Sequence, residues 1–291
     1  MSIINGFNRA EGTAVSTLRR GAINLVTALT ILMRPARSSA RLPWLGFREL
    51  AIFGGIAVAV LVLLMVTLDA AAIRGVGHMP RWIISVFREI TEFGKSGWFL
   101  WPLGILFLVL AALPPMLPPF SQPMLPPFSQ RVLAATMVRV GFLFTAIALP
   151  SLFVTIVKRL IGRARPFVGG SLDPLLFDPF AWVPAYAGMP SGHATTAFAV
   201  LVACGTLWPR ARTILLVYAV LVAISRPMVI AHYPSDVIAG ALVGMAGAMM
   251  VRRYFAERRL GFGVGPDGQI HQFPGPSIRR IKAVAHGLLA P

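Results

Sequence analysis

Residues 225–236 read Ser-Arg-Pro-Met-Val-Ile-Ala-His-Tyr-Pro-Ser-Asp, and this stretch joins two apolar runs of the chain. Arg226 and His232 are six residues apart, and Asp236 follows four residues after the histidine. A cation at the end of an apolar segment is costly unless it faces a partner or a water-filled cavity. The spacing of His232 and Asp236 lets the carboxylate accept a hydrogen bond from one imidazole nitrogen and leaves the other nitrogen free for chemistry. The stretch therefore predicts a polar site between two helices.

Two other polar clusters also lie beside apolar runs. Lys158 is followed seven residues later by Arg165, and the segment Pro-Ser-Gly-His at 190–193 comes directly before the run 194–208. Two cations on one short segment suit a phosphate, because charge-assisted hydrogen bonds are strong and a guanidinium can bind two oxygens. Ser191 suits a helix N-cap, Gly192 lets an anion approach the backbone, and the start of a helix attracts negative charge. Together the three clusters predict a phosphate site.

Each cluster taken alone also has a plainer explanation. Basic residues that flank a span often snorkel to the membrane interface, and four such residues occur together: Lys158, Arg159, Arg163 and Arg165. We assign Lys158 and Arg165 to the phosphate site and interpret Arg159 and Arg163 as residues that snorkel to the membrane interface. His193 also suits a polar anchor at an interface, and Arg226 with Asp236 also suits a structural ion pair. None of these explanations accounts for all three clusters at once.

The composition indicates a membrane protein. Of the 291 residues, 56% are hydrophobic and only 13% are charged, which is too apolar for an ordinary soluble domain. Runs close to the ~20 residues that a helix needs to cross a bilayer are followed by shorter ones whose ends suit a wet cavity. We therefore predict an all-α, polytopic bundle of six transmembrane helices with additional interfacial helices, the spans being 51–68, 97–113, 140–157, 194–208, 213–225 and 237–251.

The basic residues predict the orientation of the bundle. Six spans place both termini on one side, and that side holds 18 of the 27 Lys and Arg residues, against 9 on the other. By the positive-inside tendency, both termini are expected in the cytoplasm of a cell whose inner, or plasma, membrane holds the protein. All three polar clusters then face the periplasmic or extracytoplasmic side.

The net charge of +17 also raises the question of a nucleic-acid partner. The basic residues gather at the ends of the predicted spans, however, and form no recognisable nucleic-acid-binding module. Anionic lipid headgroups are the simpler partner, so we expect membrane lipids and no nucleic acid. The single cysteine, Cys204, excludes an intramolecular disulfide.

Three segments flank or interrupt the predicted spans. Residues 1–50 form a basic extension whose apolar part, 22–33, suits an interfacial amphipathic helix better than a cleaved signal peptide. Residues 74–95 are too charged to span and suit a helix at the outer interface. The membrane-embedded core is expected over 51–254, and 255–291 are expected to form a basic cytoplasmic tail.

A tandem repeat lies between the second and third spans. The octapeptide Pro-Met-Leu-Pro-Pro-Phe-Ser-Gln occurs at 115–122 and again at 123–130. Its prolines exclude a regular helix and favour an extended cytoplasmic loop. A proline-dependent docking site and a neutral duplication of the loop both fit, and the duplication is the better explanation because compositional signals are weak.

The three clusters resemble the signature motifs of a known family. Lys-x6-Arg-Pro, Pro-Ser-Gly-His and Ser-Arg-x5-His-x3-Asp occur in this order, each just outside a predicted span. They are similar to the motifs of the type 2 phosphatidic acid phosphatase superfamily, which includes membrane lipid phosphatases, glucose-6-phosphatase and the vanadium haloperoxidases. The resemblance covers about residues 90–252 and fills every signature position, so the combined match is highly specific although no single part is.

The resemblance implies a role for each residue. His232 would attack phosphorus and form a phosphohistidine, while Asp236 holds its tautomer. His193 would protonate the leaving oxygen and later activate water. The remaining groups would stabilise charge on the phosphoryl oxygens, namely Lys158, Arg165, Arg226, the Ser191 hydroxyl and the Gly192 amide. With these groups present and no carboxylate cluster in the sequence, we expect no metal and no cofactor.

The expected activity is hydrolysis of a lipid phosphomonoester or diphosphate by an integral-membrane phosphatase. Undecaprenyl diphosphate is a weakly preferred substrate, and phosphatidylglycerol phosphate, phosphatidic acid and the 1-phosphate of lipid A remain alternatives. A lipid-to-lipid phosphotransferase would use the same phosphohistidine. A vanadate-dependent peroxidase would be expected to be soluble, and a silent scaffold or transporter would more plausibly have lost a motif residue. The residues leave the oligomeric state open.

The orientation can be tested by thiol labelling of intact cells. In a Cys204→Ala background, we expect a cysteine at Ser171 to react with an impermeant reagent and a cysteine at Ser121 to stay unlabelled. The reason is the excess of basic residues on the side that holds Ser121. Labelling of Ser121 alone would show that the bundle is inverted.

Overall fold

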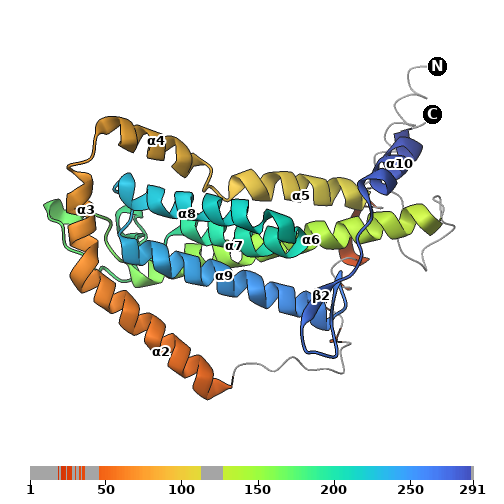
Figure 1. The fold of residues 1–291 in the computed structure, drawn as a ribbon, viewed down its shortest axis with the longest axis horizontal. Helices are drawn as coiled ribbons and strands as arrows, with labels where there is room; N and C mark the ends of the chain where they lie inside the picture. Colours follow the sequence, from red (N-terminus) through yellow and green to blue (C-terminus); the bar gives the residue numbers. More distant parts are fainter. Residues whose placement is uncertain are drawn as a thin grey trace. The chain divides into compact units, whose positions relative to one another are not determined.

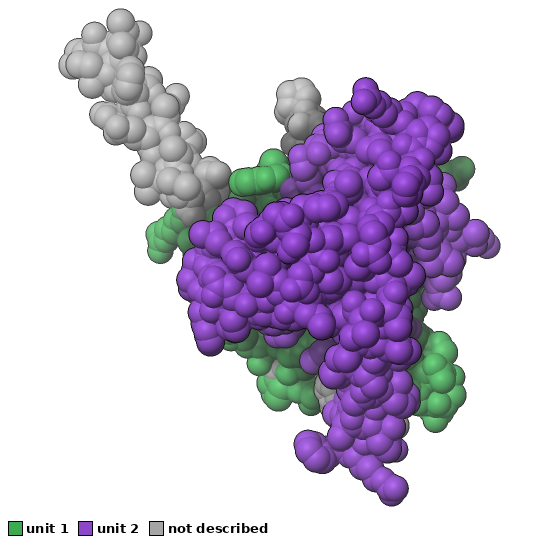
Figure 2. Space-filling view, turned by 90° about the vertical axis from the view of Figure 1, so that its left-hand side faces the viewer, with its two compact units in different colours: residues 1–41, 101–142, 253–291 green, residues 42–100, 143–252 purple. Residues whose placement is uncertain are grey.

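The computed structural model describes residues 46–112 and 127–289, together with short stretches between residues 19 and 36. The chain divides into two compact units, which Figure 2 colours separately. Unit 1 comprises residues 1–41, 101–142 and 253–291, and unit 2 comprises residues 42–100 and 143–252. The predicted N-terminal extension and the tandem repeat lie largely outside the described residues.

Helices account for nearly all the regular structure of the described chain (Figure 1). In chain order they are α2 (Phe47–Leu64), the π-helical turn η1 (Met65–Asp69), α3 (Ala70–Val76), α4 (Arg81–Glu92), α5 (Gly97–Ala112), α6 (Pro127–Ile161), α7 (Gly192–Leu207), α8 (Arg212–Met228), α9 (Pro234–Glu257) and α10 (Ile278–Leu289). Three short 3-10 turns, at Val168–Gly170, Pro184–Tyr186 and Pro209–Ala211, and a two-stranded hairpin, β1 (Phe262–Val264) with β2 (Ile270–Gln272), complete the set.

The prediction of an all-α polytopic bundle is confirmed. Each of the six predicted apolar runs coincides with a helix: α2, α5, α6, α7, α8 and α9. Within the described residues, five helical segments are long and apolar enough to cross a membrane, namely Phe47–Val76, Arg81–Ala112, Arg131–Ile161, Pro209–Met228 and Pro234–Glu257. The sixth, α7, is a shorter apolar helix. Helix α4 forms within residues 74–95, but it is part of the second of these segments, so its location at the outer interface stays a prediction.

The exposure of the helices separates lipid-facing surface from protein core. None of the residues of α2 is buried, so its long apolar surface suits contact with lipid tails. Helix α7 differs, because nine of its residues are buried in the protein. A helix enclosed by its neighbours need not cover the full thickness of a bilayer, which explains why α7 is short.

Small residues let α9 pack closely on α7. A Cβ on Gly240 would lie 2.4 Å from the Ser191 carbonyl oxygen, and one on Gly244 would lie 2.3 Å from that of Thr195. Small residues four positions apart allow two membrane helices to approach until their backbones touch. The two helices also begin together, because the Ser191 N–H donates to the Asp236 carbonyl oxygen at 2.9 Å. This packing brings two of the predicted motifs into one region of unit 2.

A glycine ends α6 just before the first motif finishes. Gly162 has φ +64°, a left-handed conformation that glycine adopts without steric cost. A Cβ there would lie 1.7 Å from the Asp178 carbonyl oxygen, and the Asp178 N–H donates to the Gly162 carbonyl at 2.7 Å. The chain therefore leaves the helix directly into the loop that carries Arg163 and Arg165.

Unit 1 has its own apolar core. Buried side chains from α5, α6 and α10 form it, namely Leu110, Ala111, Val132, Leu133, Met137, Val140 and Val284. Phe142 packs edge-on against Phe255, with ring centroids 5.5 Å apart, and against Phe262 of the hairpin at 4.8 Å. Sequence analysis described 255–291 only as a basic tail, although Pro266, Asp267 and Gly268 are a turn signal that could have indicated the hairpin.

The glycine contact between α7 and α9 can be tested by adding one methyl group. We expect Gly244→Ala to lower the thermal stability of the detergent-solubilised protein, because overpacking against backbone costs about 1–3 kcal/mol. The matched control is Gly55→Ala on α2, where the new Cβ would meet no atom within 4 Å. This control should be neutral or slightly stabilising, since alanine is the better helix former. Equal unfolding temperatures for the two variants would contradict the packing argument.

Candidate active site

The predicted motif residues gather at helix ends within unit 2. Lys158 lies in the last turn of α6 and Arg226 in the last turn of α8. Ser191 is the N-cap residue of α7, and Asp236 lies in the first turn of α9. His232 lies between α8 and α9. The ends of four helices therefore supply the polar residues, as expected for clusters that follow or precede apolar runs.

The turn between α8 and α9 has a strained backbone. Ile230 has φ +56°, which is unfavourable for a β-branched residue. Its N–H donates to the Pro227 carbonyl at 2.8 Å, and the Ala231 N–H donates to the Arg226 carbonyl at 3.0 Å. These bonds fold the chain back within a few residues, so that His232 follows Arg226 in one compact corner. Such strain persists only where the surrounding structure holds it, and it concentrates at functional sites.

His232 and Asp236 face each other inside the protein. The His232 side chain is 4% exposed and Asp236 is fully buried. The imidazole Nδ1 lies 3.6 Å from the Asp236 Oδ2, which is within ion-pair range but longer than a hydrogen bond. Within the described residues Nδ1 has no hydrogen-bond partner. The Asp236 Oδ2 instead accepts from the Tyr233 N–H at 2.9 Å.

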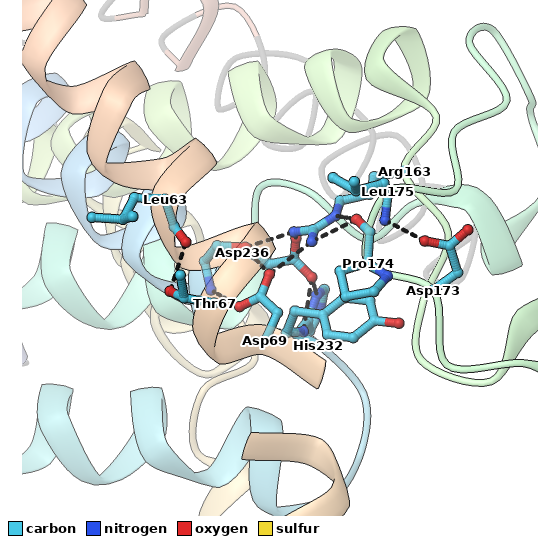
Figure 3. Close-up of polar contacts among 11 residues, drawn as sticks. Leu63, Thr67, Asp69, Arg163, Asp173, Pro174, Leu175, His232 and Asp236 are labelled. Atoms are coloured by element: carbon cyan, nitrogen blue, oxygen red, sulfur yellow. Dashed lines mark hydrogen bonds and ion pairs between the residues drawn. The ribbon is translucent and has the colours of Figure 1, made fainter. Parts of the chain in front are cut away.

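The interpretation of Arg163 as a snorkelling surface residue is wrong. Its side chain is fully buried, and Figure 3 shows it lying between two carboxylates with His232 beside them. Its Nη1 donates to the Asp236 Oδ1 at 2.5 Å and to the Ser235 hydroxyl at 2.7 Å. Its Nε and Nη2 donate to the Pro174 carbonyl at 3.0 and 2.8 Å. The turn after Gly162 directs this arginine inward, whereas its sequence neighbours at the membrane interface suggested the opposite.

Asp69 is a second residue that sequence analysis missed. It lies at the end of η1, just beyond the predicted first span 51–68, because the helical segment continues to Val76. Its buried carboxylate pairs with Arg163 through Nη2 at 2.7 Å and accepts from the Ser235 N–H at 3.0 Å and from the Ser235 hydroxyl. The available signal was its position, since Asp69 is the only acid between residues 50 and 88. An acid within an apolar helical segment needs a buried partner.

Helix α4 contacts Arg226. The Arg226 Nη1 donates a short hydrogen bond to the Thr91 hydroxyl, and the arginine is only 7% exposed. Its Nε is buried without a hydrogen-bond partner in the described chain. Arg226 therefore keeps one donor that can bind a further oxygen. The sequence of residues 81–92 predicted only a helix at the interface, and no local pattern indicates this contact.

The start of α7 presents several polar groups. The Ser191 hydroxyl does not cap the helix; it is buried and has no hydrogen-bond partner among the described residues. A Cβ on Gly192 would meet nothing within 4 Å, so the backbone there is open to close approach. Residue His193 packs against the turn after α4, where a Cβ on Gly94 would lie 2.8 Å from its Cδ2. Free N–H groups at such a helix start suit an anion.

The electrostatic neighbours of His193 link the clusters. Arg226, His232 and Arg165 all lie within electrostatic range of this ring, as does Lys95 of the turn after α4. Lys158 is half-buried and interacts in the same way with Arg165. The Arg165 backbone N–H donates to the Ala185 carbonyl at 2.9 Å, while its Nε is buried without a hydrogen-bond partner in the described residues. The structure therefore brings the three predicted motifs together.

This chain is similar to one family model, to two curated proteins and to a solved structure. Residues 139–260 match the model of the PAP2 superfamily. The lipid A 1-phosphatase of Rhizobium etli is 31% identical over 213 residues, which cover 70% of this chain and 89% of that protein. The lipid A 1-phosphatase of Rhizobium johnstonii is 31% identical over 207 residues, covering 71% and 81%. A crystal structure of Aquifex aeolicus LpxE is 22% identical with a TM-score of 0.45, covering 64% of this chain and 94% of that one.

The chain belongs to the PAP2 superfamily. It is therefore a membrane phosphatase, as the resemblance of its three motifs implied. All eight predicted site residues lie within the matched segment 139–260. The three contacts from Asp69, Thr91 and Gly94 lie before it and come from the helices that precede α6.

The arrangement can bind and activate a phosphate. Within the described residues, three predicted phosphate ligands of unit 2 have a buried group without a hydrogen-bond partner: the Nε atoms of Arg165 and Arg226 and the Ser191 hydroxyl. Buried guanidinium groups bind phosphoryl oxygens strongly, because little water competes for them. Two imidazoles of this PAP2 phosphatase, His193 and His232, lie within electrostatic range of each other. Cations for the oxygens and two rings for proton and phosphoryl transfer are the parts that phosphate hydrolysis needs.

The residues also bear on a possible metal site. Among residues 46–112 and 127–289, no group of three or more His, Cys, Asp or Glu side chains could hold a metal ion. Asp69 and Asp236 are both already paired with Arg163. The expectation that the enzyme needs no metal stays a prediction.

The burial of His232 predicts that kcat/KM begins to fall only at an unusually low pH. Burial lowers the pKa of His232 below its ordinary value of 6.5, against the opposing charge of Asp236. A lowered pKa keeps the ring neutral and nucleophilic to lower pH, so we expect the acid limb of kcat/KM to fall below pH 6.5. The substrate phosphate also titrates near pH 6. The control compares phosphomonoester substrates whose phosphates have different second pKa values. If the pH of the acid limb changes with the pKa of the substrate, or lies above 6.5, the limb does not report His232.

Proposed function

We propose that this PAP2 enzyme hydrolyses the phosphate of a lipid headgroup through a phosphohistidine at His232. The observation that carries the proposal is the buried pair of His232 and Asp236. The carboxylate lies beside Nδ1, at 3.6 Å, so the proton is expected on that nitrogen. The lone pair on Nε2 is then free to attack phosphorus.

The first half-reaction forms a bond from the His232 Nε2 to phosphorus. The bond from phosphorus to the leaving oxygen breaks, and His193 donates a proton to that oxygen so that the lipid leaves as an alcohol or a phosphate. Asp236 stabilises the positive charge that develops on the His232 ring. This role is supported by its full burial, because a charge acts more strongly in the low dielectric of a protein interior.

The second half-reaction returns the enzyme to its starting state. His193, now neutral, removes a proton from water as the water oxygen attacks phosphorus. The bond from Nε2 breaks, inorganic phosphate leaves, and both histidines regain their original protonation. During each step Arg165, Arg226 and Lys158 would stabilise charge on the phosphoryl oxygens. The Ser191 hydroxyl and the Gly192 amide would add two neutral donors.

The substrate of this phosphatase is proposed to be a lipid. The site residues lie at the ends of apolar helices, so a lipid tail can stay in the bilayer while the headgroup reaches the phosphate ligands. The 1-phosphate of lipid A is the first candidate, since two lipid A 1-phosphatases are 31% identical over most of their length. The sequence weakly favours undecaprenyl diphosphate. It is the second candidate, because no contact among the described residues and neither of these two relatives supports it. The periplasmic or extracytoplasmic location of the site remains part of the proposal.

The phosphohistidine can be trapped by removing the second role of His193. We expect His193→Ala, mixed with an activated aryl phosphate, to accumulate an acid-labile and base-stable phosphate on the chain. An activated leaving group needs no proton, whereas water still needs a base, so only dephosphorylation slows. His232→Ala is the matched control and should carry no label. Slow turnover of His193→Ala without any trapped phosphate would instead indicate direct attack by water.

A lipid panel tests both the substrate and the absence of a metal requirement. We expect the purified protein to release phosphate from lipid A in EDTA, at a rate equal to that with added Mg²⁺. Phosphatidic acid, phosphatidylglycerol phosphate and undecaprenyl diphosphate complete the panel. His232→Ala should lose activity on the order of a million-fold, as removal of a covalent nucleophile typically does. Loss of activity in EDTA would contradict the metal-independent mechanism, and phosphate appearing on a second lipid would identify a phosphotransferase.

A further inference from the structure

The first membrane helix contributes a carboxylate to the centre of the active-site region. Asp69 is fully buried, and its Oδ1 and Oδ2 contact Ser235 and Arg163. Ser235 immediately precedes Asp236, the partner of the proposed nucleophile. Burying a carboxylate costs desolvation free energy even when charged or polar partners bind both of its oxygens. We therefore expect Asp69 to have a functional role.

Arg163 is shared between two carboxylates. Its Nη2 lies 2.7 Å from the Asp69 Oδ2, and its Nη1 lies 2.5 Å from the Asp236 Oδ1. A buried arginine paired with Asp236 alone would cancel most of that carboxylate's charge. With Asp69 present, the group of three carries one net negative charge next to His232.

We propose that Asp69 is a positioning residue of the phosphatase reaction: it neutralises Arg163 so that the charge of Asp236 acts on His232, and it fixes Ser235 at the start of α9. The proposal rests on the proposed function of His232 as the nucleophile. The hydrogen bonds of Asp69 go to Arg163 and Ser235, so it acts on His232 through Arg163 and Asp236. Its effect is therefore electrostatic as well as geometric.

The sign of the effect follows from the charges around His232. Asp236 favours the protonated ring, and the cations oppose it. The charged or titratable groups around His232 in the described residues include Asp236 of α9, Arg226 of α8, His193 of α7, Tyr233 next to His232 in the chain, Arg163 and Arg165 of the loop after α6, and Asp69 of η1. Removing the charge of Asp69 makes this field more positive. The protonated imidazole and the positively charged phosphohistidine ring both become less stable.

The test measures the pH dependence of kcat/KM in Asp69→Asn. This variant keeps the shape of the side chain and loses its charge. We expect the acid limb to move about one pH unit to lower pH. We also expect kcat to fall about 10-fold to 100-fold, as for other groups that orient an active residue from behind, with KM changed less than about three-fold.

Two control variants separate charge from structure. Ser235→Ala removes the hydrogen bond that its hydroxyl donates to Asp69 and the one that it accepts from Arg163. It keeps every charge, so its acid limb should match that of the wild type. Asp173→Asn removes an exposed carboxylate whose Oδ1 accepts from the Leu175 N–H at 2.8 Å. This variant controls for general surface charge and should leave both the limb and kcat unchanged.

A second comparison covers the case in which Asp69→Asn fails to fold. It uses Arg163→Gln and the double variant Arg163→Gln/Asp69→Asn, in which one positive and one negative charge are removed together. Arg163→Gln alone removes a cation and should raise the acid limb, and adding Asp69→Asn to it should return the limb toward the wild-type position. Acid limbs that do not differ among these variants, with only the unfolding temperature lowered, would overturn the proposal and leave Asp69 a structural residue. Activity retained in His232→Ala would instead contradict the proposed function itself.

Discussion

The ion pair network around Arg163 is the interaction on which the site depends. A fully buried guanidinium binds Asp69 from the first membrane helix, Asp236 from the last, and the Pro174 carbonyl from the loop between motifs. Breaking a buried pair leaves an uncompensated charge, which typically costs about 3–5 kcal/mol. Such a group therefore tolerates few arrangements of the surrounding helices. It ties segments that are far apart in sequence to one orientation of the Asp236 carboxylate.

Close helix packing supplies the geometry that the charges need. Apolar side chains gain little from one another in a bilayer, because lipid is equally apolar. Gly240 and Gly244 instead let α9 meet the backbone of α7, where Ser191 and His193 begin the helix. The two helix starts then lie together. At the start of α9 the Ser235 N–H already donates to Asp69. At the start of α7 the backbone of Gly192 is open to close approach, and the positive end of that helix dipole lies there. An anion is favoured there before any cationic side chain is counted.

Helix α4 and the turn after it extend the site beyond the three motifs. Thr91 accepts a hydrogen bond from Arg226, and Gly94 leaves room for the His193 ring. Each contact restrains a residue that the proposed chemistry requires in a fixed place. A PAP2 phosphatase with the same motifs but a different segment here would hold its phosphate ligands differently.

The membrane class, the six apolar helices and the residue types of the proposed phosphate site could all be predicted from the sequence. Hydropathy and the spacing of motif residues are local properties, so they can be read along the chain. Tertiary structure alone decided that Arg163 points inward, that Asp69 meets it, and that Ile230 adopts a left-handed backbone. These outcomes depend on contacts between residues as many as 166 positions apart, such as Asp69 with Ser235. A local sequence pattern cannot predict such a contact. The free-energy cost of burying each charge depends on whether the fold places an opposite charge beside it.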